Sequence, residues 1–123
     1  QGKDVEAAKK LIEDAKALEA AGAFACVLEC VPAALASKIT QELTTMATIG
    51  IGAGNGCDGQ VLVCNDLLGV SDGFCPKFVK RYADIHSITV NAVKSYINEV
   101  KDRSFPAPEH TFKIDDTVLE KLY

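Results

Sequence analysis

The chain has 123 residues, of which 48% are hydrophobic, and this is enough apolar material for the core of one domain. Its net charge of −4 provides no basic surface for a nucleic acid partner. No apolar run approaches the roughly 18–20 residues that a membrane span needs, and the polar start of the chain is not typical of a signal peptide. We therefore expect neither a nucleic acid nor a membrane as partner.

The cysteines are odd in number and contain no C-x-x-C pair. Two of them lie in or beside an apolar segment, where cysteine behaves as a small hydrophobic residue. We expect a reduced, cytoplasmic protein rather than a disulfide framework or a zinc site. The five residues are Cys26, Cys30, Cys57, Cys64 and Cys75.

A first helix is predicted to begin after Asp4, which can cap it, and to stop at Gly22. A strand over about 23–28 follows almost directly. This segment carries no charge and shows no polar alternation, so we expect it to be buried on both faces. The apolar residues of the helix recur at helical spacing and are Val5, Ala8, Leu11, Ile12, Ala15 and Leu18.

Glu29 stands where this apolar strand ends, and Pro32 then turns the chain into a second helix. Sites in parallel α/β folds are built at the carboxyl ends of strands. A buried carboxylate without a partner is costly, so an acid at this position normally has a partner or a chemical role. Glu29 is therefore a candidate active-site carboxylate, and an ion pair with a neighbouring Lys or Arg is the structural alternative.

Helices and strands alternate along the rest of the chain. We predict a helix over 33–43, strands over about 45–51 and 60–64, and helices over 76–83 and 89–103. An extended tail over 105–110 and a short helix over 115–123 follow. The apolar residues of the 89–103 helix are expected to face inward; they are Val90, Val93, Tyr96, Ile97 and Val100.

This alternation predicts an α/β fold with a parallel sheet and right-handed crossovers. Three strands are too few, because a parallel sheet needs both faces covered and its apolar edge strands need neighbours. We expect about half of an eight-stranded barrel over 1–104, followed by a C-terminal tail and short helix over 105–123.

The segment 50–56 (GIGAGNG) follows a predicted strand and could let backbone N–H groups approach an anion. It lacks the G-x-G-x-x-G spacing of dinucleotide folds and the Gly-Lys-Ser/Thr ending of a phosphate loop. Two readings stay open: it lines a ligand, or it is a tight strand exit that needs glycine.

Asp58 and Asp66 are two further carboxylates near the predicted strand ends. Asp58 precedes the third strand, where capping a turn or bonding the glycine segment is the favoured role. Asp66 follows that strand much as Glu29 follows the first, but Asn65 and Asp66 are also typical of a helix N-cap, and we favour capping.

The remaining polar candidates favour structural or surface roles. His86 and His110 are far apart and lack metal-ligand spacing, so we expect each at a surface or an interface. Lys77, Lys80 and Arg81 would form a small basic patch on the 76–83 helix.

Four ordered motifs are similar to those of the ketopantoate hydroxymethyltransferase family. They are 27–32 (VLECVP), 49–54 (IGIGAG) with 57–63 (CDGQVLV), 76–78 (PKF), and 105–112 (FPAPEHTF). The resemblance covers nearly the whole chain. It implies a (β/α)8 TIM-type barrel, of which this chain would be the C-terminal half, beginning just after the fifth strand.

The resemblance implies hydroxymethyl transfer from 5,10-methylenetetrahydrofolate to 3-methyl-2-oxobutanoate, giving 2-dehydropantoate for pantothenate biosynthesis. It assigns Glu29 as the proton acceptor and Ile51, Val61 and Val63 as apolar positions around the isopropyl end of the substrate. A Mg²⁺ ion would chelate the 2-oxo acid, with its ligands in the N-terminal half, so this chain alone should be inactive. The C-terminal arm would contact other subunits of a homo-oligomer. Asn65 departs from the His that many members carry.

Two other readings remain open. One is a non-catalytic module that binds a small ligand or phosphate through Gly50–Gly56. The other is a chain that serves only in assembly, completing a barrel with a separate partner.

Overall fold

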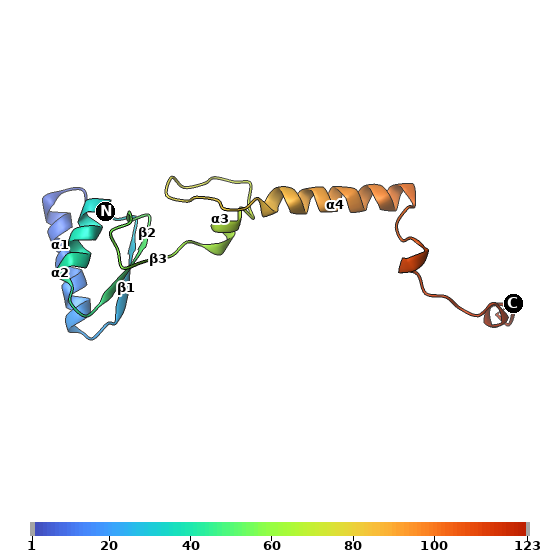
Figure 1. Ribbon diagram of the computed structural model, residues 1–123, viewed down its shortest axis with the longest axis horizontal. Helices are drawn as coiled ribbons and strands as arrows, with labels where there is room; N and C mark the ends of the chain where they lie inside the picture. The colour runs from blue at the N-terminus through green and yellow to red at the C-terminus, as the bar shows by residue number, and fades with distance from the viewer. Residues whose placement is uncertain (1, 123) are drawn as a thin grey trace. The chain divides into compact units, whose positions relative to one another are not determined.

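The computed structural model describes residues 2–122, so Gln1 and Tyr123 lie outside the described part. The chain divides into two compact units, Gln1–Ala83 and Asp84–Tyr123, each described by itself (Figure 1). The first unit holds α1 (Val5–Ala20), β1 (Ala25–Glu29), α2 (Ala33–Glu42), β2 (Ala47–Ile51), β3 (Gly59–Gln60) and α3 (Cys64–Leu68). The second holds α4 (Ile85–Asp102), a 3-10 helix η1 (Pro108–His110) and α5 (Asp116–Glu120).

The three strands form one parallel sheet in the order β1-β2-β3. In its register Val27 lies opposite Ile49, and Glu29 lies opposite Ile51. Each parallel connection in this sheet must cross over from one end to the other, and α2 is the helix that makes the β1–β2 crossover. The prediction of an α/β fold with a parallel sheet is confirmed.

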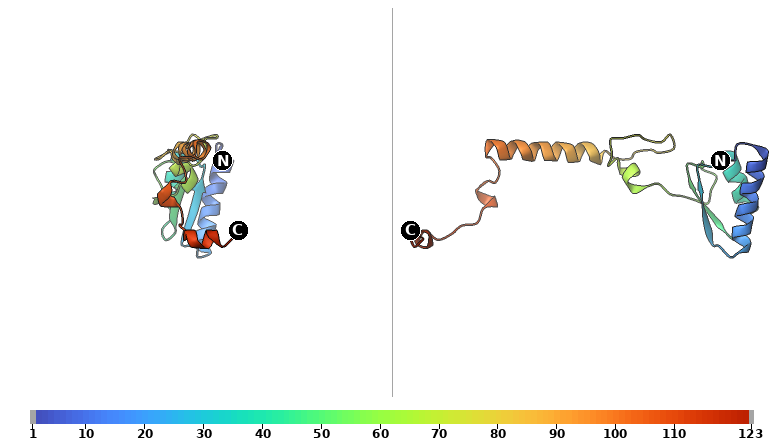
Figure 2. Two further views of the ribbon diagram at one scale, coloured as in Figure 1. Left: turned by 90° about the vertical axis from the view of Figure 1, so that its right-hand side faces the viewer. Right: turned by 180° about the vertical axis from the view of Figure 1, so that it is seen from behind.

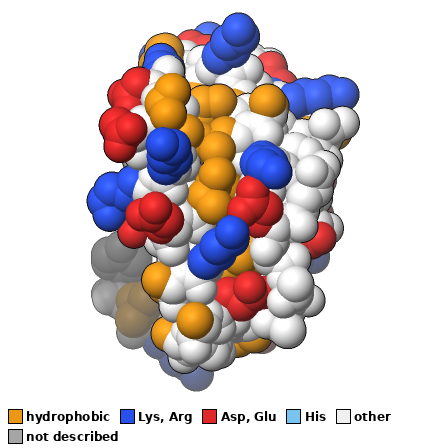
Figure 3. Space-filling model, turned by 90° about the vertical axis from the view of Figure 1, so that its left-hand side faces the viewer, with side chains coloured by type: hydrophobic (Ala, Val, Ile, Leu, Met, Phe, Trp, Pro, Cys, Tyr) orange, Lys and Arg blue, Asp and Glu red, His pale blue; other side chains and the backbone are white. Residues whose placement is uncertain are grey.

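Helices α1 and α2 lie on the same side of this sheet, as the two opposite views agree (Figures 1 and 2). The core lies between these helices and the sheet, and its centre is Ile39, only 1% exposed, with Leu28 and Ala36 beside it. The outer faces of α1 and α2 carry mixed charges (Figure 3), and the ion pair between Lys16 and Glu42, at 2.6 Å, joins the two helices.

The opposite face of the sheet is not covered by any helix that the structure describes in the first unit. Val27 on this face is 59% exposed, although the apolar strand was expected to be buried on both faces. That expectation is wrong for the described chain, because a strand with alternating side chains is buried on both faces only when both faces are covered.

Glu19 ties the end of α1 to the start of β2. Its Oε1 accepts hydrogen bonds from the backbone N–H groups of Thr44, Thr45 and Met46, at 2.7, 2.6 and 3.1 Å. The bonds from Thr45 and Thr44 lower the pKa of Glu19 from 4.5 to about 2. This carboxylate therefore stays ionised and fixes the loop that leads into the second strand.

The first two strands and the second helix differ by one or two residues at their ends from the predicted bounds, and two other predicted elements of the first unit differ more strongly. The third strand was expected over 60–64 but covers only Gly59–Gln60, because α3 already begins at Cys64. The helix expected over 76–83 does not form. A single turn forms there, in which the Val79 N–H donates to the Pro76 carbonyl at 2.9 Å. The Tyr82 N–H donates to the distant Leu67 carbonyl at 2.8 Å, so it does not extend a helix.

In the second unit, α4 begins at Ile85, earlier than predicted, because the Asp84 side chain caps it by accepting from Ser87 N–H at 3.0 Å. The apolar side of α4 was expected to face inward. Most of it is exposed instead, because apart from Phe105, whose ring lies against Tyr96, no described residue of this unit covers it. The exposed residues are Val93, Tyr96, Ile97 and Val100.

The segment after α4 folds back on the end of that helix. The centroid of the Phe105 ring lies 5.6 Å from the centroid of the Tyr96 ring and 5.2 Å from the centroid of the His110 ring. The predicted extended tail thus contains the short η1 turn, and the last helix is confined to Asp116–Glu120. None of the helices described for residues 2–122 is both long and apolar enough to cross a membrane.

Candidate functional site at the carboxyl end of the sheet

Glu29 is the last residue of β1 and its side chain is exposed. Side chains alternate along a strand, so Glu29 projects from the helix-free face, opposite to Leu28 of the core. Cys30 follows with a φ of 53° and donates its N–H to the Ile51 carbonyl at 2.9 Å. Among residues 2–122 no Lys or Arg pairs with Glu29, so the structural ion-pair reading finds no support there.

Ile51 and Val61 lie beside Glu29 in the sheet. Ile51 is the register partner of Glu29 in β2. Val61 directly follows β3 and donates its N–H to the Gly50 carbonyl at 3.0 Å, which places it next to Ile51. The fourth predicted residue, Val63, is not in the sheet but precedes the first turn of α3, where it is half exposed.

The glycine segment 50–56 connects β2 to the start of β3 and approaches α2 closely. Gly52 and Gly54 have φ values of 65° and 75°, which favour glycine. A Cβ at Gly54 would lie 2.5 Å from the Cβ of Ala33, so this position also requires the absence of a side chain. The Gln60 side chain holds the segment by donating from Nε2 to the Gly54 carbonyl at 2.8 Å. These features support the tight strand exit, and the segment also lines a hollow.

Asp58 has the structural role expected for it, although its partner is a strand residue. Its Oδ2 accepts from the backbone N–H of Thr48 at 2.8 Å and from the Thr48 hydroxyl at 3.2 Å. The Thr48 hydroxyl lies 2.7 Å from that of Thr40 and is fully buried. Asp58 therefore joins β2 to the segment before β3.

The expected cap of α3 is wrong. The N-cap position is Val63, which offers no side-chain hydrogen bond, and Asp66 lies inside the first turn of the helix. There a carboxylate interacts favourably with the positive end of the helix dipole.

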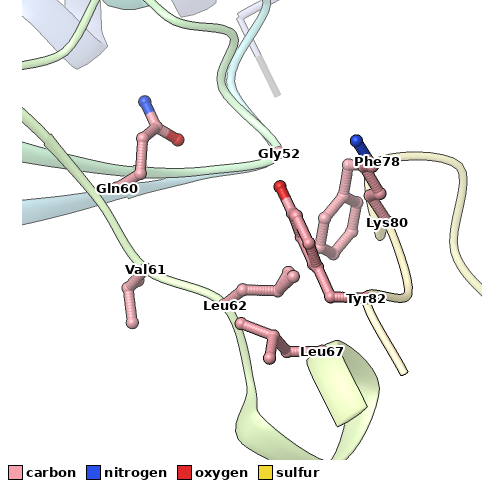
Figure 4. Close-up of a pocket in the computed structure, with 8 residues that line it drawn as sticks. All are labelled: Gly52, Gln60, Val61, Leu62, Leu67, Phe78, Lys80 and Tyr82. Atoms are coloured by element: carbon pink, nitrogen blue, oxygen red, sulfur yellow. The ribbon is translucent and has the colours of Figure 1, made fainter. Parts of the chain in front are cut away.

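Two hollows meet at the carboxyl end of the sheet. One, of about 900 Å³, is lined by Cys30, Pro32 and Lys77 among others. The other hollow has a volume of about 580 Å³ (Figure 4). Val61 and Leu62 line one side of it, and Phe78, Lys80 and Tyr82 line another. Both hollows share Gly52, Gln60 and Phe78 as walls, so they adjoin each other.

Among the residues that line the second hollow, sequence reasoning singled out Val61 and Lys80 but assigned no role to Phe78 or Tyr82. Phe78 belongs to the 76–78 motif, which indicates family resemblance but no role for this side chain, and no periodic pattern marks Tyr82. The basic residues Lys80 and Arg81 are not on a helix. Lys80 Nζ lies 4.9 Å from the centroid of the Tyr82 ring, and Arg81 donates to the Gly73 carbonyl at 3.2 Å.

The cysteine side chains form no disulfide, and all five are free. Burial raises the pKa of the Cys26 thiol, and the nearby Cys57 adds to this shift. Among residues 2–122 no group of three or more His, Cys, Asp or Glu side chains is arranged to hold a metal ion. The described residues therefore do not by themselves fit a Mg²⁺ site, which takes several oxygen ligands.

Comparison with known proteins gives a consistent result. A family model described as ketopantoate hydroxymethyltransferase matches residues 1–108. The chain is 62% identical over all of its 123 residues to a protein of Enterococcus faecalis named 3-methyl-2-oxobutanoate hydroxymethyltransferase. It is 58% identical to a protein of the same name from Clostridium novyi, again over 123 residues. In both cases the chain spans 44% of the relative's length.

Proposed function

Because this chain belongs to the ketopantoate hydroxymethyltransferase family, we propose that it supplies the C-terminal half of a (β/α)8 barrel enzyme of pantothenate biosynthesis. The enzyme transfers a hydroxymethyl group from 5,10-methylenetetrahydrofolate to 3-methyl-2-oxobutanoate and forms 2-dehydropantoate. Relatives that are 58% and 62% identical over the whole chain carry the corresponding name. The chain spans 44% of their length, which leaves room for the other half of a barrel.

The helix-free sheet face supports the half-barrel proposal. In a (β/α)8 barrel the helices lie outside and the inner strand face is filled by side chains of the other strands. Here α1 and α2 cover one face, while Val27, half-buried Ile49 and half-buried Ile51 line the other. We assign residues 1–104 to the half-barrel and 105–123 to a tail that contacts another subunit.

The position of Glu29 carries the proposed mechanism. It ends β1 on the inner face, at the edge where barrel enzymes bind substrate, and no described cation neutralises it. Glu29 takes the proton from C3 of the 2-oxo acid as a general base. Ile51, Val61 and Val63 contact the isopropyl end of the substrate.

The reaction balances with water as the third reactant. The C3 carbon forms a new bond to the methylene carbon, and both C–N bonds between that carbon and the folate break. Water supplies the hydroxyl group, and its second hydrogen together with the C3 proton protonates the two folate nitrogens. We propose that the Mg²⁺ ligands lie in the N-terminal half, since the residues described here do not form such a site.

Two further assignments follow from the family. We propose a cytoplasmic homo-oligomer, in agreement with the free thiols of all five cysteines. The contact between subunits would use the segment after Phe105.

The test is complementation with the N-terminal half of a family member, followed by measurement of 2-dehydropantoate formation. We expect activity in the complemented parent and a loss of roughly 100-fold or more in Glu29→Gln, as removal of a general base produces. Glu13→Gln, on the exposed outer face of α1, is the matched control and should keep full activity. An inactive complemented parent would instead favour a binding module that uses Gly50–Gly56. Undiminished activity of the Glu29→Gln variant would exclude Glu29 as the general base.

A further inference from the structure

Cys30, the residue directly after Glu29, has a backbone conformation that residues with a side chain rarely adopt. Its φ of 53° lies in the left-handed region, and among the described residues other than glycine only Arg103, at the end of α4, also has a positive φ. We propose that Cys30 is a positioning residue for the reaction, because its left-handed conformation fixes the direction in which the Glu29 carboxylate leaves the sheet. This inference rests on the proposed function, in which Glu29 is the general base.

The turn at Cys30 ends the first strand abruptly. β1 runs through Glu29, Cys30 turns the chain, and the next residue, Val31, is already buried in the core below the sheet edge. A residue with extended dihedral angles at position 30 would continue the strand instead. The left-handed turn is therefore what makes Glu29 the last residue of β1.

A hydrogen bond holds the peptide group between Glu29 and Cys30. The Cys30 N–H donates to the Ile51 carbonyl at 2.9 Å, and Ile51 is the register partner of Glu29 in β2. This bond fixes the peptide plane that follows Glu29, and the parallel pairing of β1 with β2 holds the backbone that precedes it. The backbone of Glu29 is thus held on both sides.

The side chain of Cys30 lies against the glycine segment. A Cβ on Gly52 would lie 3.4 Å from Cys30 Sγ and 3.0 Å from the Phe78 ring, so both side chains closely approach this glycine. The left-handed conformation costs free energy for a residue that carries a Cβ, so it persists only where the surroundings support it. The bond to Ile51 and the contact with Gly52 are the support that the structure shows.

The position of the Glu29 carboxylate decides how well it can remove a proton. A general base must lie within hydrogen-bond reach of that proton, and a misplacement of about 1 Å can slow a reaction by about 100-fold. Glycine at position 30 would adopt the left-handed conformation without strain, but it would also allow many other conformations. The Cys30 side chain therefore restricts the turn after Glu29, although the residue itself is strained.

The experiment changes residue 30 and keeps the base. In the protein complemented with the N-terminal half, Cys30→Gly and Cys30→Ser are compared with the parent, since serine keeps a side chain of similar size but lacks the thiol. Arg103→Gly is the matched control, because it makes the same change at the other left-handed residue, which belongs to the second unit.

The measurements separate the chemistry from binding and from folding. The exchange of the C3 proton of 3-methyl-2-oxobutanoate for deuterium in D2O is followed by NMR without folate. Its dependence on the concentration of the acid gives the rate at saturation and the half-saturating concentration. Urea unfolding gives the midpoint for each variant.

We expect Cys30→Gly to slow the saturated exchange about tenfold, with the half-saturating concentration within about twofold of the parent value. Its urea midpoint should equal or exceed that of the parent, because glycine removes the strain. Arg103→Gly should likewise not lower the midpoint, and it should leave the exchange unchanged. Cys30→Ser should exchange within about threefold of the parent, because its side chain restricts the turn in the same way.

Exchange at the parent rate in Cys30→Gly would overturn the proposed positioning. Equal losses in Cys30→Gly and Cys30→Ser would also overturn it, because the thiol itself would then take part in the reaction. A slower exchange accompanied by a lower urea midpoint in Cys30→Gly would overturn it as well, because the loss would then come from the fold. Absence of exchange in the parent would instead defeat the proposed function.

Discussion

Glu19 and Glu29 are carboxylates at opposite ends of the same sheet, and their surroundings differ. Glu19 accepts three backbone N–H groups where the chain enters β2. Glu29 stands at the exit of β1 without an ion pair among the described residues. The Glu19 carboxylate is thus occupied by hydrogen bonds that stabilise the fold, whereas the Glu29 carboxylate has no such ion pair and fits the proposed contact with a substrate.

The hydrogen bonds of Glu19 predict a specific dependence of stability on pH. Its pKa in the folded chain, about 2, is below the ordinary 4.5, so its stabilising effect is complete above about pH 5 and is lost as pH falls toward 2. In the complemented protein, Glu19→Gln should therefore lose less stability than the parent between pH 6 and pH 3. Urea unfolding at several pH values measures this. Glu13→Gln is the control, and parallel curves for parent and Glu19→Gln would contradict the assignment.

At the scale of elements, the α1–β1–α2 segment packs its apolar residues into one core around Ile39. Ile39→Ala should destabilise the protein by about 2–5 kcal/mol, since a fully buried isoleucine leaves a cavity. Ile88→Ala, which removes an isoleucine that is 63% exposed on α4, should cost far less. Denaturant unfolding measures both, and equal losses would show that the core is not centred on Ile39.

The elements also show what the sequence could reveal. Helix α1 was predictable because a cap, a helical stripe and a terminal glycine agree. The position of Glu29 at the end of a strand was predictable because an acid ends an uncharged run. The 76–83 segment was mispredicted because Tyr82 N–H bonds to distant Leu67, which no local pattern signals. The second hollow escaped notice for the same reason, as it depends on the path of an irregular backbone. The prediction that the apolar side of α4 faces inward was wrong, because burial depends on neighbouring elements that the periodicity of one helix does not identify.

At the scale of the whole molecule, the exposed sheet face supports the proposal that the chain depends on a partner. Val27 and Val61 leave apolar surface on or beside the face that a barrel would enclose. Such surface favours association in water. We therefore propose that the chain is one part of an assembly whose other part covers this face.

This dependence predicts that the isolated chain self-associates. Sedimentation velocity should show oligomers or aggregates for the chain alone and a defined species with the N-terminal half. Val27→Lys should reduce the self-association, because it places a charge on the helix-free face. Val5→Lys, at an exposed position of α1, should leave it unchanged. A parent chain that sediments as a single monomeric species would contradict the proposal that the chain is half of a barrel.

The proton at C3 of 3-methyl-2-oxobutanoate provides the most direct test of the role of Glu29. The measurement is deuterium exchange at C3 in D2O by NMR, on the complemented protein without folate, for the parent and Glu29→Gln. We expect rapid exchange in the parent and exchange slower by roughly 100-fold or more in the variant. Equal exchange rates in the two proteins would show that another group removes the proton.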